Sequence, residues 1–129
     1  MDKSSERGAA AVEFAILLPL LVMLLMGIIE FGRAYNAQIS LTSAARESVR
    51  VMAISNNPTS AKAAAVNAAG SLHPALRTTD VGITTTAASP ALCAVGANAT
   101  VTINYSLSTM TGIAGPFSLT AKGVMQCGG

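Results

Sequence analysis

Residues 9–29 read AAAVEFAILLPLLVMLLMGII, and this stretch decides how the rest of the chain is interpreted. Its one charged residue is Glu13, and 16 uncharged residues separate Glu13 from Glu30. As a helix, those 16 residues span only about 24 Å, whereas residues 9–29 span about 31 Å. The hydrocarbon core of a bilayer is about 30 Å thick, so only the longer stretch crosses it. We therefore predict a transmembrane helix over residues 9–32, with Glu13 inside the apolar layer near one boundary.

The segment before the span, residues 1–8, is a short polar leader that carries both acidic and basic residues. A secretory signal peptide is the first alternative. The apolar stretch is longer than a typical signal core, and no small-residue cleavage motif follows it. Moreover, the apolar pattern continues into an amphipathic helix, which favours a retained membrane anchor.

The composition excludes several classes of function. Charged residues make up 11% of the chain, the net charge is +2, and 24 of the 129 residues are alanine. A charge so low and so scattered does not suit nucleic-acid binding. With His73 as the single histidine and only two cysteines, a four-ligand metal site is almost excluded and nucleophilic catalysis has little to draw on. We expect no enzyme, no metal, no cofactor and no small-molecule substrate.

Beyond the span, we predict a small α+β domain over residues 33–129. Neither proline nor glycine interrupts residues 33–55, which continue the helix until Asn56-Asn57-Pro58 ends it. A second helix is predicted over residues 59–72, with Thr59 or Ser60 as its N-cap.

Three segments with period-2 alternation of apolar and polar residues then predict strands at about 80–88, 99–107 and 117–127. We expect them to form an antiparallel sheet whose apolar face packs on residues 33–55. Past residue 35 this domain has only Tyr105 and Phe117 as aromatic residues, so its core is small.

The two cysteines, Cys93 and Cys127, both lie in this domain. A disulfide between them would stabilise the small core, and an oxidising compartment outside the cytoplasm would permit it. The alternative is two unpaired thiols. Since the basic residues around the span do not decide its orientation, the cysteines favour an N-terminus inside and a domain outside.

The junction of leader and span carries the sharpest functional signal. The segment Gly8-Ala9-Ala10-Ala11-Val12-Glu13-Phe14 resembles the processing site of type IV pilins and pseudopilins. Two wider stretches, RGAAAVEFAILLPLL (7–21) and EFGRAYNAQISLTSAARESVRV (30–51), resemble the TadE-like proteins of the tight-adherence (Flp pilus) system. Together they cover about a third of the chain.

This resemblance implies that a prepilin peptidase cuts between Gly8 and Ala9, with Glu13 and Phe14 serving processing and assembly. It implies a minor pilin-like subunit in pilus assembly and surface adhesion. The protein would reside in the bacterial inner membrane, partnered by other pilins and tight-adherence assembly proteins. The competing interpretation is an uncut, membrane-anchored extracytoplasmic binding or sensor module. A type II secretion pseudopilin is a neighbouring alternative.

The position of Glu13 in the apolar stretch has a physical explanation within that hypothesis. A carboxylate in lipid is costly and persists where it finds a partner. The free amine of Ala9 on a neighbouring subunit would be such a partner after processing, and the first turn of the shortened helix also favours a negative charge. The alternative is a boundary glutamate that is hydrated by local thinning of the bilayer.

Overall fold

The computed structural model describes residues 3–88 and 92–128. The chain divides into two compact units, Met1–Arg33 and Ala34–Gly129, which are considered separately. Helix α1 (Lys3–Ser55) supplies the described part of the first unit and also the first element of the second. The structure confirms the predicted α+β class, with a long N-terminal helix, a short helix and a three-stranded antiparallel sheet.

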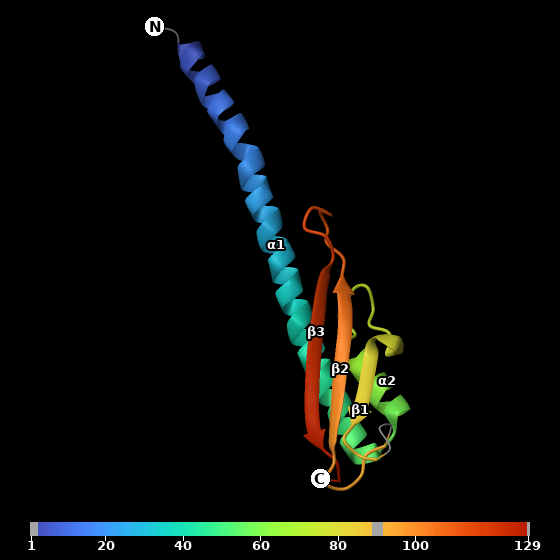
Figure 1. Ribbon diagram of the computed structural model, residues 1–129. Coiled ribbons are helices and arrows are strands. Elements are labelled where there is room, and N and C mark those ends of the chain that lie inside the picture. Colours follow the sequence, from blue (N-terminus) through green and yellow to red (C-terminus); the bar gives the residue numbers. More distant parts are fainter. Residues whose placement is uncertain (1–2, 89–91, 129) are drawn as a thin grey trace. The chain divides into compact units, whose positions relative to one another are not determined.

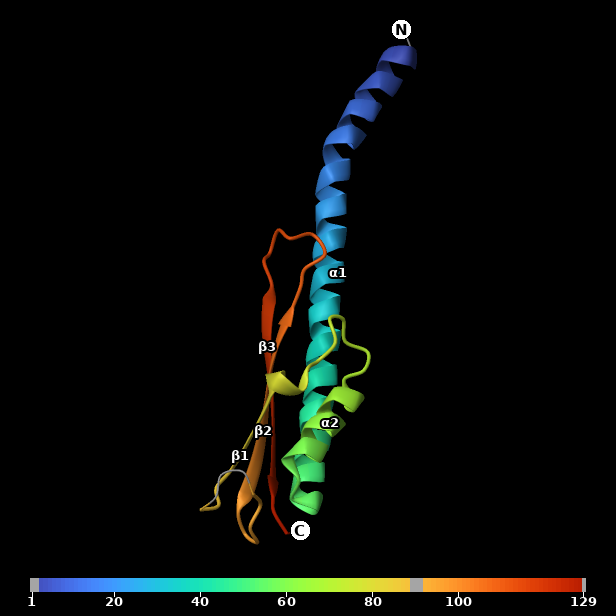
Figure 2. The ribbon, with the colours of Figure 1, turned by 90° about the vertical axis from the view of Figure 1, so that its right-hand side faces the viewer.

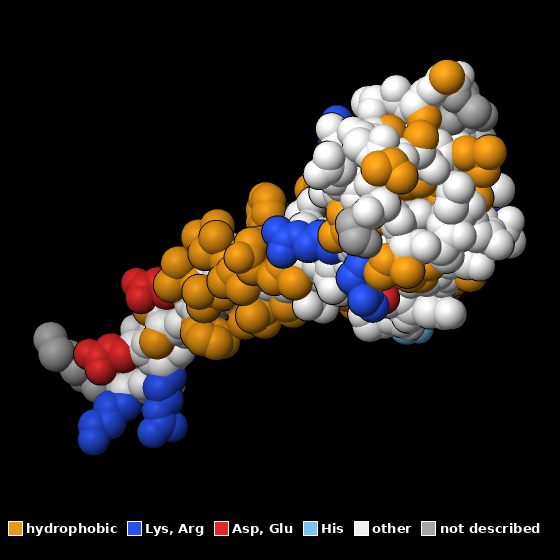
Figure 3. Space-filling view, turned by 90° about the horizontal axis from the view of Figure 1, so that it is seen from below, with side chains coloured by type: hydrophobic (Ala, Val, Ile, Leu, Met, Phe, Trp, Pro, Cys, Tyr) orange, Lys and Arg blue, Asp and Glu red, His pale blue; other side chains and the backbone are white. Residues whose placement is uncertain are grey.

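The first unit is helical throughout its described part, including residues 3–8 of the polar leader. Every large hydrophobic side chain between Val12 and Ile29 is at least 36% exposed, so the protein itself buries none of them well. Hydrophobic side chains cover the visible face of this segment in Figure 3, and charged ones gather at its N-terminal end. Helix α1 is a candidate membrane span by length and composition, with an 18-residue window whose mean hydropathy is 2.6.

The second unit has two layers. One is the sheet, in the order β1 (Val81–Thr85), β2 (Asn98–Leu107) and β3 (Phe117–Gln126), with antiparallel neighbours. The other consists of the α1 residues of this unit and α2 (Pro58–Ala68), which cover one face of the sheet (Figures 1 and 2). A short 3-10 helix, η1 (Thr78–Asp80), leads into β1.

The core lies between these layers and follows the predicted alternation in β2. Five β2 side chains at every second position are buried, as are four α1 residues that share one stripe: Ala99, Val101, Ile103, Tyr105 and Leu107, with Leu41, Ala45, Val49 and Met52. A second α1 stripe was equally apolar in sequence, but its members in this unit, Tyr35 and Ile39, are 72% and 53% exposed. The sheet therefore selects one of the two stripes.

Several predicted boundaries shift by a few residues. The second helix runs over Pro58–Ala68 instead of 59–72, and its N-cap is Asn57, not Thr59 or Ser60. The Asn57 side chain accepts hydrogen bonds from the amides of Thr59 and Ser60, while Pro58 occupies the first turn, where no amide donor is needed.

The first strand is also shorter than predicted, ending at Thr85 and not near residue 88. Its ladder partner on β2 there is Ala99, close to the start of that strand, so little of β2 is left to pair with. Met125 shares the inward-facing parity of Ala121 and Gly123 and pairs with buried Ala99, yet it is 39% exposed near the end of β3.

Candidate functional site

The predicted processing residues all lie on exposed helix in the first unit. Gly8 is within α1, one turn and a half after the helix begins at Lys3, and an added methyl group there would meet no atom within 4 Å. Glycine costs a helix interior about 1 kcal/mol relative to alanine, so Gly8 makes this turn easier to open than its alanine-rich surroundings. The Gly8–Ala9 peptide bond is therefore sterically accessible and lies in a locally weakened turn.

Glu13 lies four residues after Ala9, a spacing that places both on the same face of the helix. The Glu13 side chain is exposed, and among the described residues it has no ion pair or hydrogen bond. No Lys or Arg occupies a position three or four residues away on either side. A counter-charge for this carboxylate must therefore come from outside its own helix face.

Phe14 follows Glu13 and is 60% exposed, like the apolar side chains after it. Pro19 stands inside α1 without ending the helix, as is common in membrane spans, where other groups satisfy the freed carbonyl. The four sequence-predicted residues Gly8, Ala9, Glu13 and Phe14 thus form one continuous exposed segment that leads into the candidate span.

A second acidic residue, Glu30, stands at the far end of the apolar stretch. It is only 5% exposed, and its Oε2 atom lies 3.6 Å from Nη1 of Arg33. The two ends of the stretch therefore differ. Glu30 has a basic residue of the same helix beside it, whereas Glu13 has none.

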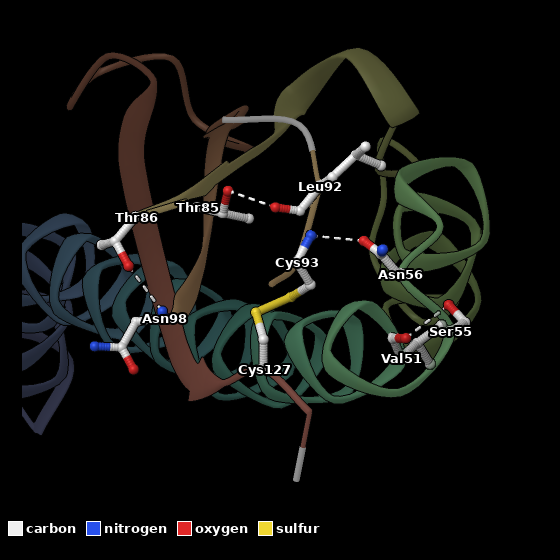
Figure 4. Close-up of a disulfide and its surroundings, with 9 residues drawn as sticks. All are labelled: Val51, Ser55, Asn56, Thr85, Thr86, Leu92, Cys93, Asn98 and Cys127. Carbon is white, nitrogen blue, oxygen red and sulfur yellow. Dashed lines mark hydrogen bonds between the residues drawn. A yellow bond between two sulfur atoms is a disulfide. The ribbon is translucent and has the colours of Figure 1, made fainter. Parts of the chain in front are cut away.

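The other predicted pair, Cys93 and Cys127, forms a disulfide in the second unit, with Cα atoms 5.5 Å apart (Figure 4). The amide of Cys93 donates to Oδ1 of Asn56 at 2.6 Å, and the amide of Cys127 donates to the carbonyl of Ala97 at 2.7 Å. Asn56, with φ of 50°, directly follows Ser55, the last residue of α1. The disulfide thus joins the segment before β2 to the end of β3, and the hydrogen bond to Asn56 connects that segment to the end of α1.

Sequence reasoning missed two residues that fix the layers of this unit. The hydroxyl of Ser48, fully buried, donates to the carbonyl of Ala61 at 2.7 Å and connects α1 to α2. Gly123 brings β3 against α1, where a Cβ atom would lie 2.6 Å from the carbonyl oxygen of Ala45. A small polar residue in an apolar helical stripe and a glycine within a strand pattern are the signals that could have indicated both.

An exposed ion pair lies on the outer face of α1 in the second unit. Arg50 donates to both carboxylate oxygens of Glu47, at 3.0 and 3.1 Å. These hydrogen bonds from Arg50 hold the pKa of Glu47 below its ordinary value, with the positive charge of Arg50 contributing further. Both side chains are well exposed, so this is a solvated pair and not a buried site.

Within residues 3–88 and 92–128, no group of three or more His, Cys, Asp or Glu side chains is arranged to hold a metal ion. His73 lies at the surface, with Nδ1 3.2 Å from the carbonyl oxygen of Ser71.

Comparison with known proteins identifies the class of the N-terminal segment. Residues 8–50 match the family model described as TadE-like protein, which confirms the resemblance based on the sequence. No curated protein and no solved structure gives a significant match. The match covers a third of the chain, and the apolar part of the matched segment is a candidate membrane span by length and composition.

Proposed function

We propose that this protein is a minor pilin-like subunit of a Flp, or tight-adherence, pilus. It would be made as a precursor, anchored in the inner membrane by residues 9–32 and cut by a prepilin peptidase between Gly8 and Ala9. The observation that carries this proposal is the family match itself, which begins at Gly8 and extends through Glu13 and the whole apolar stretch. The exposure of Gly8 and its lack of steric neighbours favour access by a peptidase.

Glu13 would act in assembly once the leader is removed. After the cut, Ala9 carries a free amine, and Glu13 becomes the fifth residue of the mature chain. A carboxylate in the apolar layer without a basic neighbour on its own helix favours pairing with the new amine of an adjacent subunit. Because this pair forms only between subunits, it would set the axial register of assembly.

The second unit would lie outside the cytoplasm. The Cys93–Cys127 pairing suits an oxidising compartment, and disulfides rarely persist in the bacterial cytoplasm. In this orientation the domain joins other pilins and tight-adherence assembly proteins, and the assembled pilus adheres to surfaces.

The experiment compares the intact mass and the N-terminal peptide of the protein in its own host membranes, with and without the prepilin peptidase. We expect a peptidase-dependent N-terminus at Ala9. The Gly8→Ala variant should accumulate uncut, although the added methyl group fits the helix without a clash. Glu6→Ala, which removes an exposed carboxylate from the leader, is the matched control and should be processed normally.

A chain that still carries its leader in both strains would overturn the processing proposal. The uncut membrane-anchored binding or sensor module would then become the better interpretation. For the assembly role, Glu13→Gln keeps the size of the side chain but loses the charge. If this variant enters the pilus as efficiently as the unaltered protein, the pairing of Glu13 with Ala9 is wrong.

A further inference from the structure

The loop between β2 and β3, residues 108–116, is an apolar tip without any charged residue. Its sequence is STMTGIAGP, and Ile113 and Met110 are 83% and 68% exposed. The loop has local order of its own. The amide of Gly112 donates to Oγ1 of Thr109 at 3.1 Å, and Gly112 adopts a φ of 69° that favours glycine. The exposed apolar side chains are therefore held on a shaped turn.

The loop lies at the end of the second unit where the chain enters at Ala34. Two contacts fix the direction of β3 along α1: Nε2 of Gln38 donates to the carbonyl of Thr120, and Gly123 lies against Ala45. The steps from Thr120 to Gly123 along the strand and from Gln38 to Ala45 along the helix are both about 10 Å. The two elements therefore advance together in the same direction.

Extending this register backward places the loop at the same end of the second unit as Ala34. From Gln38 back to Ala34 is about 6 Å along the helix, whereas from Thr120 back to Phe117 is about 10 Å along the strand. The loop precedes Phe117 and thus lies at the end of the second unit where the chain enters it. Figures 1 and 2 show it at the end of the sheet opposite to the C-terminus.

We infer that this loop inserts its Ile113 and Met110 side chains into the interface of the lipid bilayer that holds the apolar segment. The inference rests on the proposed membrane anchor, because the chain enters the second unit directly after the candidate span. An uncharged, apolar loop carries no ionic group that would have to be desolvated at a lipid surface. The tether also makes insertion intramolecular, so a weak contact suffices.

The hydrogen-bonding needs of the loop backbone limit how deeply it can enter the bilayer. Backbone amides and carbonyls of an irregular segment need water or headgroups as partners, which excludes the hydrocarbon interior. The side chains are therefore expected about 5–10 Å into the boundary between headgroups and acyl chains. The loop at the other end of the unit carries Val95, which is 91% exposed, and this second exposed apolar residue should remain in water.

The chain contains no tryptophan, so single-tryptophan variants report on each position without background. The full-length protein would be reconstituted in phosphatidylethanolamine and phosphatidylglycerol vesicles that contain phosphatidylcholine brominated either near the headgroup or near the acyl end. The variants are Ile113→Trp in the loop, Val95→Trp as the matched exposed control and Leu21→Trp within the apolar segment. Hydrogen exchange of β2 amides verifies that each variant folds.

We expect the emission of Ile113→Trp to be quenched mainly by bromines near the headgroup and that of Leu21→Trp by bromines near the acyl end. The emission of Val95→Trp should be unaffected. If Leu21→Trp is quenched but Ile113→Trp behaves like Val95→Trp, the loop inference is wrong and the anchor stands. If Leu21→Trp is not quenched, the proposed membrane anchor is wrong, and the loop inference, which depends on it, is wrong as well. A blue shift of Ile113→Trp that grows with the protein-to-lipid ratio, without lipid quenching, would assign the loop to a neighbouring copy and also overturn the inference.

Discussion

Gly123 of β3 packs so closely on α1 that a Cβ atom at this position would lie 2.6 Å from the carbonyl oxygen of Ala45 and 2.9 Å from its carbonyl carbon. Both are backbone atoms, which cannot move aside as the end of a flexible side chain can. The absence of a side chain at residue 123 therefore sets the distance between the sheet and the helix.

Replacement of Gly123 by alanine should destabilise the second unit by about 1–3 kcal/mol, because the layers must separate to admit the methyl group. The measurement is urea unfolding of the full chain in a mild detergent, followed by the near-UV circular dichroism of buried Tyr105. Gly82→Ala in β1 is the control, since its Cβ would meet the nearest carbonyl oxygen at an ordinary 3.6 Å. Equal losses in both variants would show that strand glycines, and not this contact, determine the effect.

Ser48→Ala should cost about 1 kcal/mol, the net value of a typical buried hydrogen bond. Its hydroxyl is fully buried and holds the carbonyl of Ala61 at 2.7 Å, so α2 loses a polar tie to α1. The same unfolding experiment measures the loss. Ser55→Ala removes an exposed hydroxyl that bonds to Val51 within α1 and should change the free energy of unfolding very little.

Asn57→Ala should destabilise α2 by about 0.5–2 kcal/mol, because the amides of Thr59 and Ser60 lose the side chain that caps them. Amide hydrogen exchange resolved along α2 is the suitable measurement, with faster exchange expected at its first turn. Asn67→Ala, at an exposed position inside the same helix, should leave that turn unchanged. Slower exchange in Asn57→Ala would contradict the capping role.

Loss of the disulfide in a Cys93→Ser, Cys127→Ser protein should lower the free energy of unfolding by roughly 3–4 kcal/mol in the loop-entropy model. The two residues are 34 positions apart, and the loop that the bond closes sets this magnitude. Unfolding of the native chain with and without a reductant provides an independent measurement. A native chain that is insensitive to the reductant and yields two titratable thiols would mean that the bond does not form.

The Glu47–Arg50 pair predicts a small acid-side dependence of stability. Arg50 lowers the pKa of Glu47 in the folded state, so the contribution is present above the ordinary glutamate pKa. It is lost as the pH falls through the lowered value. In Arg50→Ala the pKa of Glu47 should rise toward its ordinary range, which an NMR titration of its side-chain carboxyl can follow. Arg46→Ala is the control, because Arg46 makes no described ion pair with Glu47.

The class of the fold could be predicted because the spacing of apolar residues that distinguishes a helix from a strand can be read from a short stretch of sequence. The β2 residues from Ala99 to Leu107 alternate strictly, and the structure buries every second one. The stripe containing Tyr35 and Ile39 looked equally apolar, yet it stays exposed. Which stripe of α1 the sheet covers depends on where β3 can approach the helix. Gly123 allows that approach at Ala45, about 80 residues earlier in the chain.

The processing segment was predictable for a different reason. Its glycine, its glutamate and their spacing belong to one contiguous stretch, and residues 8–50 match the TadE-like model. The role of Ser48 could not be predicted in this way. Its hydroxyl donates to the carbonyl of Ala61, 13 residues later, and the position of that carbonyl depends on how α2 packs on α1. Cleavage at Gly8 and the role of Glu13 stay predictions.

The position of β3 also governs the order in which the second unit can be built. β3 follows every other element of the unit in the chain, yet it is the strand that lies on α1 through Gln38 and Gly123. During synthesis, the α1 surface around Gln38 and Ala45 therefore stays uncovered by β3 until residues 117–126 have left the ribosome. Folding of this unit is therefore completed only after the last strand of the chain has been made. The interval before it ends is when a chaperone or a protease would meet the chain.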